Sequence, residues 1–221
     1  MGKLVSYVTA RHLSTNRDYL ARMIDEKVKC MEVAKLYEKD YWDGERRYGY
    51  GGYKYISGWW TPAAKSLVED YGLTNSSSVL DVGCGKGYLL YELKQLLPDL
   101  KIAGFDISEY ALTNAKEDIK TSLFKHSAQS TYPYDDNEFD LVISLGCIHN
   151  LRLFELEKAV KEIERVGQNG YIVAESYRNS EELFNLQCWA LTCQTFLDYD
   201  EWIWLYNKFG YTGDYEFIFF E

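Results

Sequence analysis

Three glycines at alternate positions, Gly83, Gly85 and Gly87, separate a short apolar run from a leucine-rich segment. The run before them, at 78–82, predicts a buried strand, and the leucines at 89–97 predict a helix. A loop between a strand and a helix brings free backbone N–H groups to the carboxyl end of a sheet, beside the helix N-terminus. Glycine is needed where a Cβ would collide with a molecule bound over the loop. The stretch therefore predicts an α/β fold that holds a ligand at this point.

The chain around this loop alternates β-branched runs with helical periodicity, which is typical of a parallel sheet with crossover helices. At 221 residues it suits one α/β domain with a short appendage. Strands are expected at 78–82, 101–106, 122–126, 139–145, 171–176 and 214–220. Helices are expected at 89–97, 108–119, 154–166 and 199–210, with further helical stretches within 19–38.

The spacing of the loop separates it from two common nucleotide-binding loops. A dinucleotide fingerprint reads G-x-G-x-x-G, whereas the third glycine here comes one residue earlier. A Walker A loop needs Ser or Thr directly after its lysine, but Lys86 is followed by Gly87 and Tyr88. The sequence therefore disfavours a nicotinamide oxidoreductase and excludes a P-loop nucleotidase.

Charge and composition narrow the class of partner. The chain has 34 acidic and 24 Lys or Arg residues, a net charge of −10, and nucleic-acid partners are held by clustered basic residues. Its five cysteines form no C-x-x-C pair of a zinc site, and no ligand cluster for any metal is visible. No apolar window matches a signal peptide or a membrane span. We expect a cytoplasmic protein with no metal, no nucleic-acid partner and no membrane partner.

Asp81 followed by G-x-G-x-G resembles the first motif of the class I S-adenosylmethionine-dependent methyltransferases of the small-molecule type. The resemblance covers about residues 77–176 and continues loosely to the last strand. Asp106 ends the next strand, 19 positions after Gly87, where an acid that accepts both ribose hydroxyls is expected. The resemblance implies S-adenosylmethionine as cofactor and S-adenosylhomocysteine as product. The cofactor-binding residues that follow are Asp81, Gly83, Cys84, Gly85, Gly87, Asp106, Ile107, Ala128, Gln129, Leu145 and Gly146.

The resemblance also implies a three-layer Rossmann-like sandwich, with two departures in this chain. The family's usual aspartate for the adenine amino group falls on Ala128, so Gln129 or a backbone group is expected to replace it. The family's sheet ends in an antiparallel hairpin, whereas only one terminal strand is evident here. We therefore expect a mainly parallel sheet of six or seven strands with an antiparallel C-terminal strand, the remaining strand lying in 188–196 or being absent.

His149 is the candidate general base for methyl transfer. His12, His126 and His149 are the histidines of the chain, and His149 alone follows a central strand. A structural role, capping a loop or packing beside the sheet, is the alternative. Glu175 and Tyr177 follow the fifth strand and are candidate acceptor contacts, or polar groups satisfied by loop amides.

The aromatic run at 46–60 predicts a lid. Its glycines provide hinges, and its tyrosines combine apolar faces with hydroxyl groups that suit a polar small molecule. Arg46, Tyr50 and Tyr53 are candidate acceptor contacts, with Arg46 and Arg47 as anchors for an anionic acceptor. Packing of this run as a satellite core is the alternative. We divide the chain into a lid segment, 1–60, and a cofactor-binding domain, 61–221.

These features predict an enzyme that methylates a small polar metabolite. We expect O-methylation of a sugar or phosphorylated precursor in surface-carbohydrate biosynthesis. N-methylation of a small amine is an alternative, because the glycine loop indicates the methyl donor and says nothing about the acceptor. A non-catalytic cofactor-binding or scaffold protein is the other alternative, because the adenine site is altered.

Overall fold

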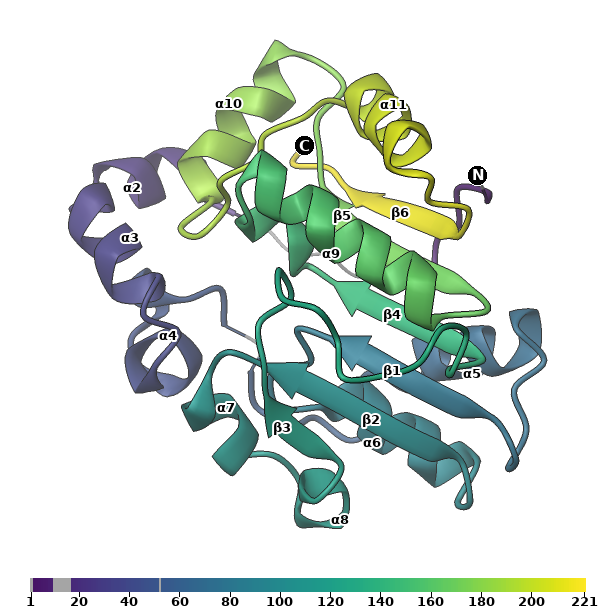
Figure 1. Ribbon diagram of the computed structural model, residues 1–221. Coiled ribbons are helices and arrows are strands. Elements are labelled where there is room, and N and C mark those ends of the chain that lie inside the picture. Colours follow the sequence, from purple (N-terminus) through teal and green to yellow (C-terminus); the bar gives the residue numbers. More distant parts are fainter. Residues whose placement is uncertain (1, 10–16, 52) are drawn as a thin grey trace.

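The computed structural model describes residues 2–9, 17–51 and 53–221. His12, one of the three histidines considered above, lies outside the described residues. Among them is a parallel six-stranded sheet in the order β3-β2-β1-β4-β5-β6 (Figure 1). The strands are β1 Ser78–Val82, β2 Lys101–Asp106, β3 Leu123–Lys125, β4 Leu141–Leu145, β5 Gly170–Glu175 and β6 Asp214–Ile218. The central strands are almost wholly buried, as expected for a sheet covered on both faces.

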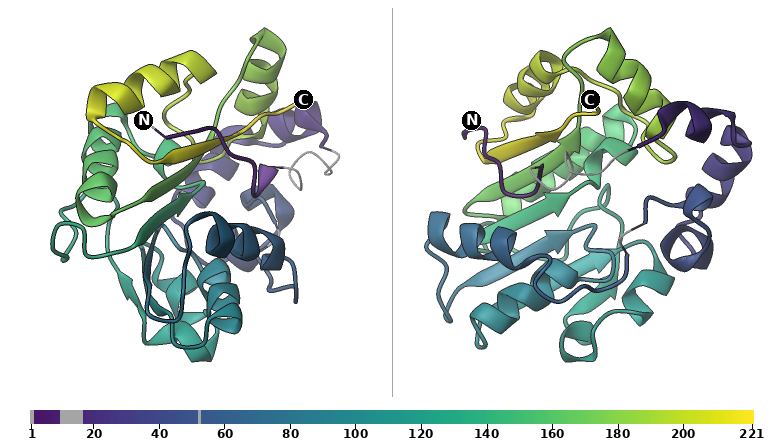
Figure 2. Two further views of the ribbon diagram at one scale, coloured as in Figure 1. Left: turned by 90° about the vertical axis from the view of Figure 1, so that its right-hand side faces the viewer. Right: turned by 180° about the vertical axis from the view of Figure 1, so that it is seen from behind.

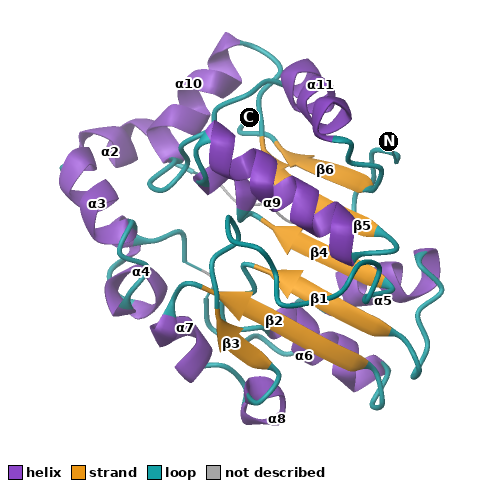
Figure 3. Cartoon of the chain, viewed as in Figure 1, coloured by secondary structure: helices purple, strands orange, loops and turns teal. Residues whose placement is uncertain are grey.

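Helices cover both faces of the sheet, which confirms the three-layer prediction (Figure 3). On one face, α9 Leu153–Val166 and α11 Tyr199–Phe209 pack their apolar stripes against the strands. On the other face lie α5 Thr61–Asp70, α6 Tyr88–Leu96 and the short α8 Glu117–Lys120. Both faces of β1, β4 and β5 are therefore buried, and their carboxyl ends are left to form a site.

The strand order reverses beside β1, and this reversal positions the site. The first strand pairs with β2 on one side and with β4 on the other, so the crossovers that leave β1 and β4 run in opposite directions. In open α/β sheets, ligands bind in the crevice outside the carboxyl ends at such a switch point. The glycine loop directly follows β1 and therefore lies in this crevice.

The prediction of an antiparallel C-terminal strand is wrong. β6 runs parallel to β5, with Tyr171 opposite Asp214 and Glu175 opposite Ile218. The chain between the two strands contains α10 Ser180–Trp189 and α11, and such a helical crossover permits the parallel direction. Residues 190–196 contain no strand, so the described sheet ends at β6 without a seventh member.

One predicted helix is broken into two, and the predicted helical stretches within 19–38 form two separate helices. The segment at 108–119 forms α7 Glu109–Thr113 and α8, because Asn114 turns its side-chain amide back to the Tyr110 carbonyl at 2.8 Å. Ser108 caps α7 as predicted, accepting the Ala111 N–H at 3.1 Å. The segment at 19–38 forms α2 Tyr19–Ile24 and α3 Lys27–Ala34, separated at Glu26, whose φ is +43°.

The N-terminal region lies across the carboxyl ends of the strands (Figures 1 and 2). It contains α2, α3, α4 Lys39–Asp43 and the single 3₁₀ turn Arg46–Tyr48, and α2 packs against α10. Its aromatic rings form a cluster of their own around Tyr41, with Trp42, Tyr50 and Tyr53. We call residues 17–60 the lid, within the described parts of the chain. The boundary between lid and domain stays a prediction.

The outer edge of β6 is covered by the start of the chain (Figure 2). The Val5 N–H donates to the Tyr215 carbonyl at 3.0 Å, and the Tyr215 N–H donates to the Lys3 carbonyl at 3.2 Å. The Glu216 carboxylate accepts the N–H groups of residues 7, 8 and 9. Residues 3–9 thereby form a strap along the last strand.

No helix in the described parts of the chain is long and apolar enough to cross a membrane.

Candidate active site

A cavity of about 990 Å³ lies between the lid and the carboxyl ends of the strands. Its walls come from the strap, the lid, the loops after β1, β2, β3 and β4, and the end of β5. Most of the predicted site residues line it: Arg46, Tyr50, Tyr53, Gly83, Asp106, Ile107, Ala128, Gln129, Leu145, Gly146, His149 and Glu175. Asp81, Cys84, Gly85, Gly87 and Tyr177 are not among its lining residues.

Two positions in the glycine loop admit no side chain. Gly83 has φ +76°, and a Cβ there would lie 2.4 Å from Cys147 Sγ. Gly85 has φ +55°, and a Cβ there would lie 2.7 Å from the Trp42 ring. Contacts below 3 Å cannot be accommodated without movement of the loop or its neighbour. The loop therefore needs glycine both for its turn and for the close approach of the lid.

Two buried carboxylates flank the loop. Asp81 is 3% exposed, and its Oδ1 has no hydrogen-bond partner among the described residues. Burial, with a smaller contribution from Asp106, raises the pKa of Asp81 to about 8. Asp106 accepts the Gly85 N–H at 2.9 Å and the Ser108 N–H at 2.8 Å, and burial raises its pKa. An unpaired buried carboxylate of this kind fits a cationic group of a ligand.

Three further residues expected at the cofactor site, Ile107, Ala128 and Gln129, line the cavity together with Asp106. Ile107 is 47% exposed, an unusual state for a large apolar side chain at a site wall. Ala128 is buried and offers no polar group. The Gln129 amide lies beside Glu155, and with its nitrogen turned toward that carboxylate the hydrogen bond is 2.8 Å. Ile107 and Ala128 thus form an apolar part of a wall that also contains His126 and Ser127, and the Gln129 amide is held by Glu155.

Contacts between the lid and the glycine loop were missed by sequence reasoning. Lys86 Nζ donates to Asp43 Oδ1 and Oδ2 at 2.7 and 2.8 Å and to the Tyr53 carbonyl at 3.1 Å. Trp42 Nε1 donates to Ser108 Oγ at 2.8 Å. The only local signal was the lysine inside the glycine loop, which needs a carboxylate when buried. We call the Lys86–Asp43 pair the latch.

His149 and Glu175 meet at the ends of β4 and β5. His149 is 4% exposed, and its Nδ1 accepts the Glu175 backbone N–H at 3.2 Å. Its Nε2 lies 3.4 Å from Glu175 Oε2. Burial lowers the pKa of His149 to about 3, and burial raises the pKa of Glu175 to about 7. The two side chains form one buried unit facing the cavity.

The lid brings cations and aromatic rings to the same cavity. The Arg46 guanidinium lies 5.1 Å from the centre of the Trp189 ring, and the Arg17 guanidinium lies 5.2 Å from it. The Tyr50 hydroxyl accepts the Leu191 N–H at 2.7 Å, which ties the lid to the chain after α10. Burial raises the pKa of Tyr50, so its hydroxyl stays neutral.

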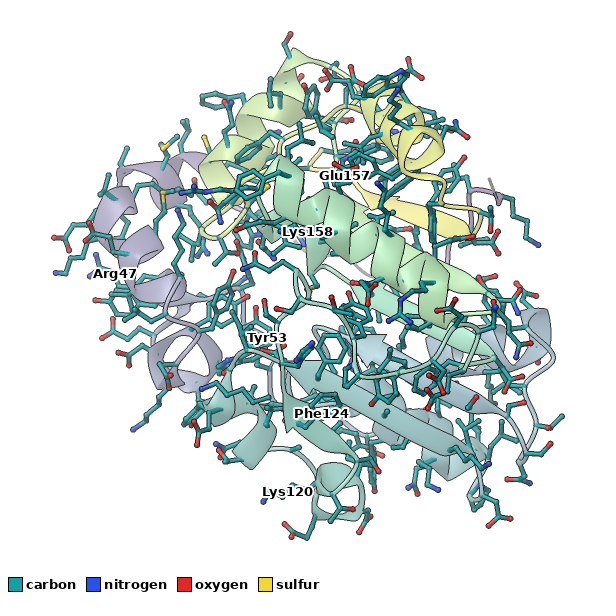
Figure 4. The ribbon with its side chains drawn as sticks, viewed as in Figure 1. Arg47, Tyr53, Lys120, Phe124, Glu157 and Lys158 are labelled. Atoms are coloured by element: carbon teal, nitrogen blue, oxygen red, sulfur yellow. The ribbon has the colours of Figure 1, made fainter. Side chains whose placement is uncertain are left out.

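Three residues that were expected to contact the acceptor, Tyr53, Tyr177 and Arg47, instead make their hydrogen bonds within the protein. Tyr53 lines the cavity, but its hydroxyl donates to Tyr41 at 2.8 Å within the aromatic cluster (Figure 4). Tyr177 pairs its backbone with Asp198 and packs in a separate cluster around Leu186. Arg47 lies on the outer side of the lid and bonds to Asp25 and Glu26 at 2.7 Å each (Figure 4). Of the two arginines expected to anchor an anion, only Arg46 lines the cavity.

No group of three or more His, Cys, Asp or Glu side chains suited to a metal ion occurs in the part of the chain that the structure describes.

Comparison with known proteins assigns residues 73–212, more than half of the chain, to a methyltransferase domain. The uncharacterized methyltransferase sll0829 of Synechocystis sp. is 28% identical over 119 residues, 53% of this chain and 55% of that protein. The mouse mitochondrial arginine-hydroxylase NDUFAF5 is 29% identical over 109 residues, 49% of this chain and 31% of that protein. The chain therefore matches about a third to a half of these relatives' length.

The fold is also found in solved structures. One is a chain of the complex between the Haloferax volcanii Trm112 methyltransferase activator and a methyltransferase, with a TM-score of 0.54 and 19% identity over 89% of this chain and 77% of that chain. Another is a methyltransferase from Bacillus halodurans, with a TM-score of 0.54 and 19% identity over 66% of this chain and 68% of that chain. The matched domain contains the whole glycine loop and strands β1 to β5. This chain belongs to the class I S-adenosylmethionine-dependent methyltransferases.

Proposed function

We propose that this protein transfers the methyl group of S-adenosylmethionine to a hydroxyl group of a small polar metabolite, a sugar or a phosphorylated sugar precursor. The observation that carries the proposal is one cavity of about 990 Å³ lined both by Gly83 and Asp106 and by Arg46, His149 and Glu175. Methyl transfer is an in-line displacement, and the protein contributes mainly by holding the reacting atoms about 3–3.5 Å apart. A single cavity that joins donor-binding and acceptor-binding groups meets this requirement.

The donor would be held by residues of the loop and of β2. The unpaired Asp81 Oδ1 suits its ammonium group, and the Asp106 carboxylate, which lines the cavity, suits its ribose hydroxyls. Ile107 and Ala128 offer an apolar surface to the adenine ring. When bound, the donor supplies a methyl group on a positively charged sulfur. The lid lies over the cavity, and exclusion of water there when the donor is bound would favour transfer to the acceptor over hydrolysis.

The acceptor side favours an anionic or strongly polar small molecule. Arg17 and Arg46 line the cavity in a protein whose net charge is −10, so cations are concentrated where the acceptor binds. Guanidinium groups recognise phosphate and carboxylate through paired N–H donors. Arg22 also lies over Trp189, but its donors are used by the Trp189, Arg46 and Gly49 carbonyls. Arg22 therefore holds the lid, whereas the Arg46 guanidinium makes one long hydrogen bond of 3.4 Å among the described residues, to the Gly49 carbonyl.

The experiment measures donor binding and acceptor preference separately. S-adenosylhomocysteine is titrated into the protein by calorimetry, with Asp106→Ala as the variant that loses binding and the exposed Asp99→Ala as its control. Formation of S-adenosylhomocysteine is then followed with S-adenosylmethionine and a set of sugars, sugar phosphates and small amines. Turnover of a sugar phosphate supports the proposal.

Two outcomes support other functions. Turnover of amines alone would replace O-methylation by N-methylation of a small amine. Absence of any binding heat at millimolar S-adenosylhomocysteine would remove the enzyme and leave a scaffold protein.

A further inference from the structure

Both ring nitrogens of His149 are directed at Glu175. Nδ1 accepts the Glu175 backbone N–H at 3.2 Å, so the neutral ring carries its proton on Nε2. Nε2 in turn lies 3.4 Å from Glu175 Oε2. A general base needs an available lone pair within reach of the acceptor, and the Nδ1 lone pair is used while Nε2 bears hydrogen. The ring as placed fixes the Glu175 backbone N–H but cannot take a proton.

The Glu175 carboxylate has the property that His149 lacks. Oε2 is buried and has no hydrogen bond among the described residues, although the side chain lines the cavity. The Glu175 backbone is fixed by its place at the end of β5 and by the Trp202 indole, which donates to its carbonyl at 3.1 Å. The Glu175 side chain is 10% exposed and lines the cavity from the end of a rigid strand, so its carboxylate is placed to accept a proton from a molecule bound there.

We propose that Glu175 takes the proton of the acceptor hydroxyl, and that His149 is a positioning residue that holds Glu175 through its backbone N–H. The inference rests on the proposed function, because it concerns a hydroxyl acceptor. In the step, the acceptor O–H bond breaks and its proton passes to the Glu175 carboxylate. The oxygen electron pair forms the new bond to the methyl carbon, and the carbon–sulfur pair stays on the sulfur of the donor. The products are a methyl ether, neutral S-adenosylhomocysteine and a protonated Glu175, which then loses its proton to solvent.

The surroundings of Glu175 bring its pKa close to neutral pH, as a general base requires. Burial raises its pKa to about 7, against the opposing effect of cations on the lid. Burial lowers the pKa of His149 to about 3, so the imidazole stays neutral throughout the working range. The base is active when ionised, so turnover rises with pH through about 7. The titratable and charged groups that face Glu175 are His149, Arg17, Arg22, Lys27, Tyr50, Tyr53 and Cys193.

The decisive experiment asks which of the two side chains titrates near neutral pH, and it needs no acceptor. The intact protein is labelled with ¹³C at the glutamate carboxyl and ¹⁵N in the histidine rings, and NMR spectra are recorded against pH. The Glu175 signal is identified by its loss in Glu175→Gln and, should that variant fail to fold, in Glu175→Asp. We expect Glu175 to titrate at about 7 and the His149 ring to keep one neutral form. A Glu175 midpoint near about 4.3, or a His149 midpoint near about 6.5, their ordinary values, would overturn the inference.

Activity variants separate proton transfer from positioning, using the sugar phosphate that is turned over fastest. We expect Glu175→Gln to lower kcat by about 10²–10⁴-fold, the usual contribution of a general base. His149→Asn keeps an acceptor for the Glu175 N–H, so we expect a smaller loss, with the pH midpoint shifted but still present. Glu92→Gln is the control. Glu92 lies on α6, is only 4% exposed, and accepts hydrogen bonds from Tyr55 and Thr61 outside the cavity. Retained turnover in Glu175→Gln with loss in His149→Asn would overturn the inference.

The readouts separate failure of the inference from failure of the proposed function. Absence of S-adenosylhomocysteine binding in the unmodified protein counts against the proposed function alone. The NMR titration counts for or against Glu175 whatever the acceptor is.

Discussion

The latch joins the lid to the glycine loop, and we expect the loss of Asp43 and the loss of Lys86 to open the lid to different extents. The Lys86 side chain is 5% exposed, whereas that of Asp43 is 23% exposed. Removing Asp43 leaves a buried ammonium group whose remaining hydrogen bond among the described residues is to the Tyr53 carbonyl. Removing Lys86 leaves a carboxylate that keeps contact with water and with the Tyr110 hydroxyl at 2.9 Å. We therefore expect Asp43→Ala to open the lid more than Lys86→Met.

The size of the effect follows from burial. Breaking a fully buried pair costs about 3–5 kcal/mol, and an exposed pair contributes about 0–1 kcal/mol. With one partner buried and the other partly hydrated, we expect about 2 kcal/mol for Asp43→Ala and about 1 kcal/mol for Lys86→Met. These values correspond to about 30-fold and about 5-fold increases in the lid-opening equilibrium.

Hydrogen exchange measured by mass spectrometry tests this prediction. Peptides from the lid at 39–48 should exchange faster in both variants, in the stated order, while peptides from β4 and α9 stay unchanged. The control is Lys120→Met, because its ion pair with Glu117 is exposed and distant from the lid (Figure 4). Equal exchange in all variants, or a larger effect of Lys86→Met, would refute the reasoning.

Three further predictions concern the glycine loop, the buried Asp81 and the arginine expected to bind the acceptor. Gly83→Ala should destabilise the fold by about 3 kcal/mol, from its positive φ and the collision with Cys147; Cys147→Gly should restore part of the loss in chemical unfolding. The folded pKa of Asp81, about 8, lies above the unfolded value, so its contribution is present in acid and is lost as pH rises toward 8. Asp81→Asn should therefore gain in melting temperature relative to the unmodified protein as pH rises from about 4 to 8, and a pH-independent difference would contradict this. Arg46→Ala should raise KM for an anionic acceptor about 10–100-fold without changing S-adenosylhomocysteine affinity, and Arg47→Ala should change neither.

The placement of the glycine loop beside Asp106 was predictable because local backbone constraints determine it. A strand, a run of glycines and a helix have one common arrangement, and an acid at the end of the next strand falls beside it. The neighbouring ends of β4 and β5 likewise made a meeting of His149 and Glu175 predictable in outline. The hydrogen bonding between them was not, because the direction of a single N–H from Glu175 decides which ring nitrogen bears hydrogen.

Other features depend on contacts between distant parts of the chain. Asp43 and Lys86 are far apart in the sequence, and nothing in either local pattern selects the other as partner. The direction of β6 depends on how α10 and α11 pack between it and β5, which periodicity within the strand does not report. Of the two alternatives for a further strand, the one at 188–196 does not form, because Tyr50 binds the Leu191 and Thr192 N–H groups that a ladder would have used.

The strap along β6 has a consequence for how copies of this protein behave toward one another. A free edge strand offers unpaired N–H and C=O groups to the edge of another molecule, and proteins protect such edges with covering segments or charges. Here the strap pairs with the backbone N–H and C=O groups of Tyr215. The buried Glu216 carboxylate accepts backbone N–H groups of the strap and so fixes it in place. Replacing Glu216 by an apolar residue would release that cover. The first result expected is self-association through the sheet edge at high concentration, before any loss of the fold.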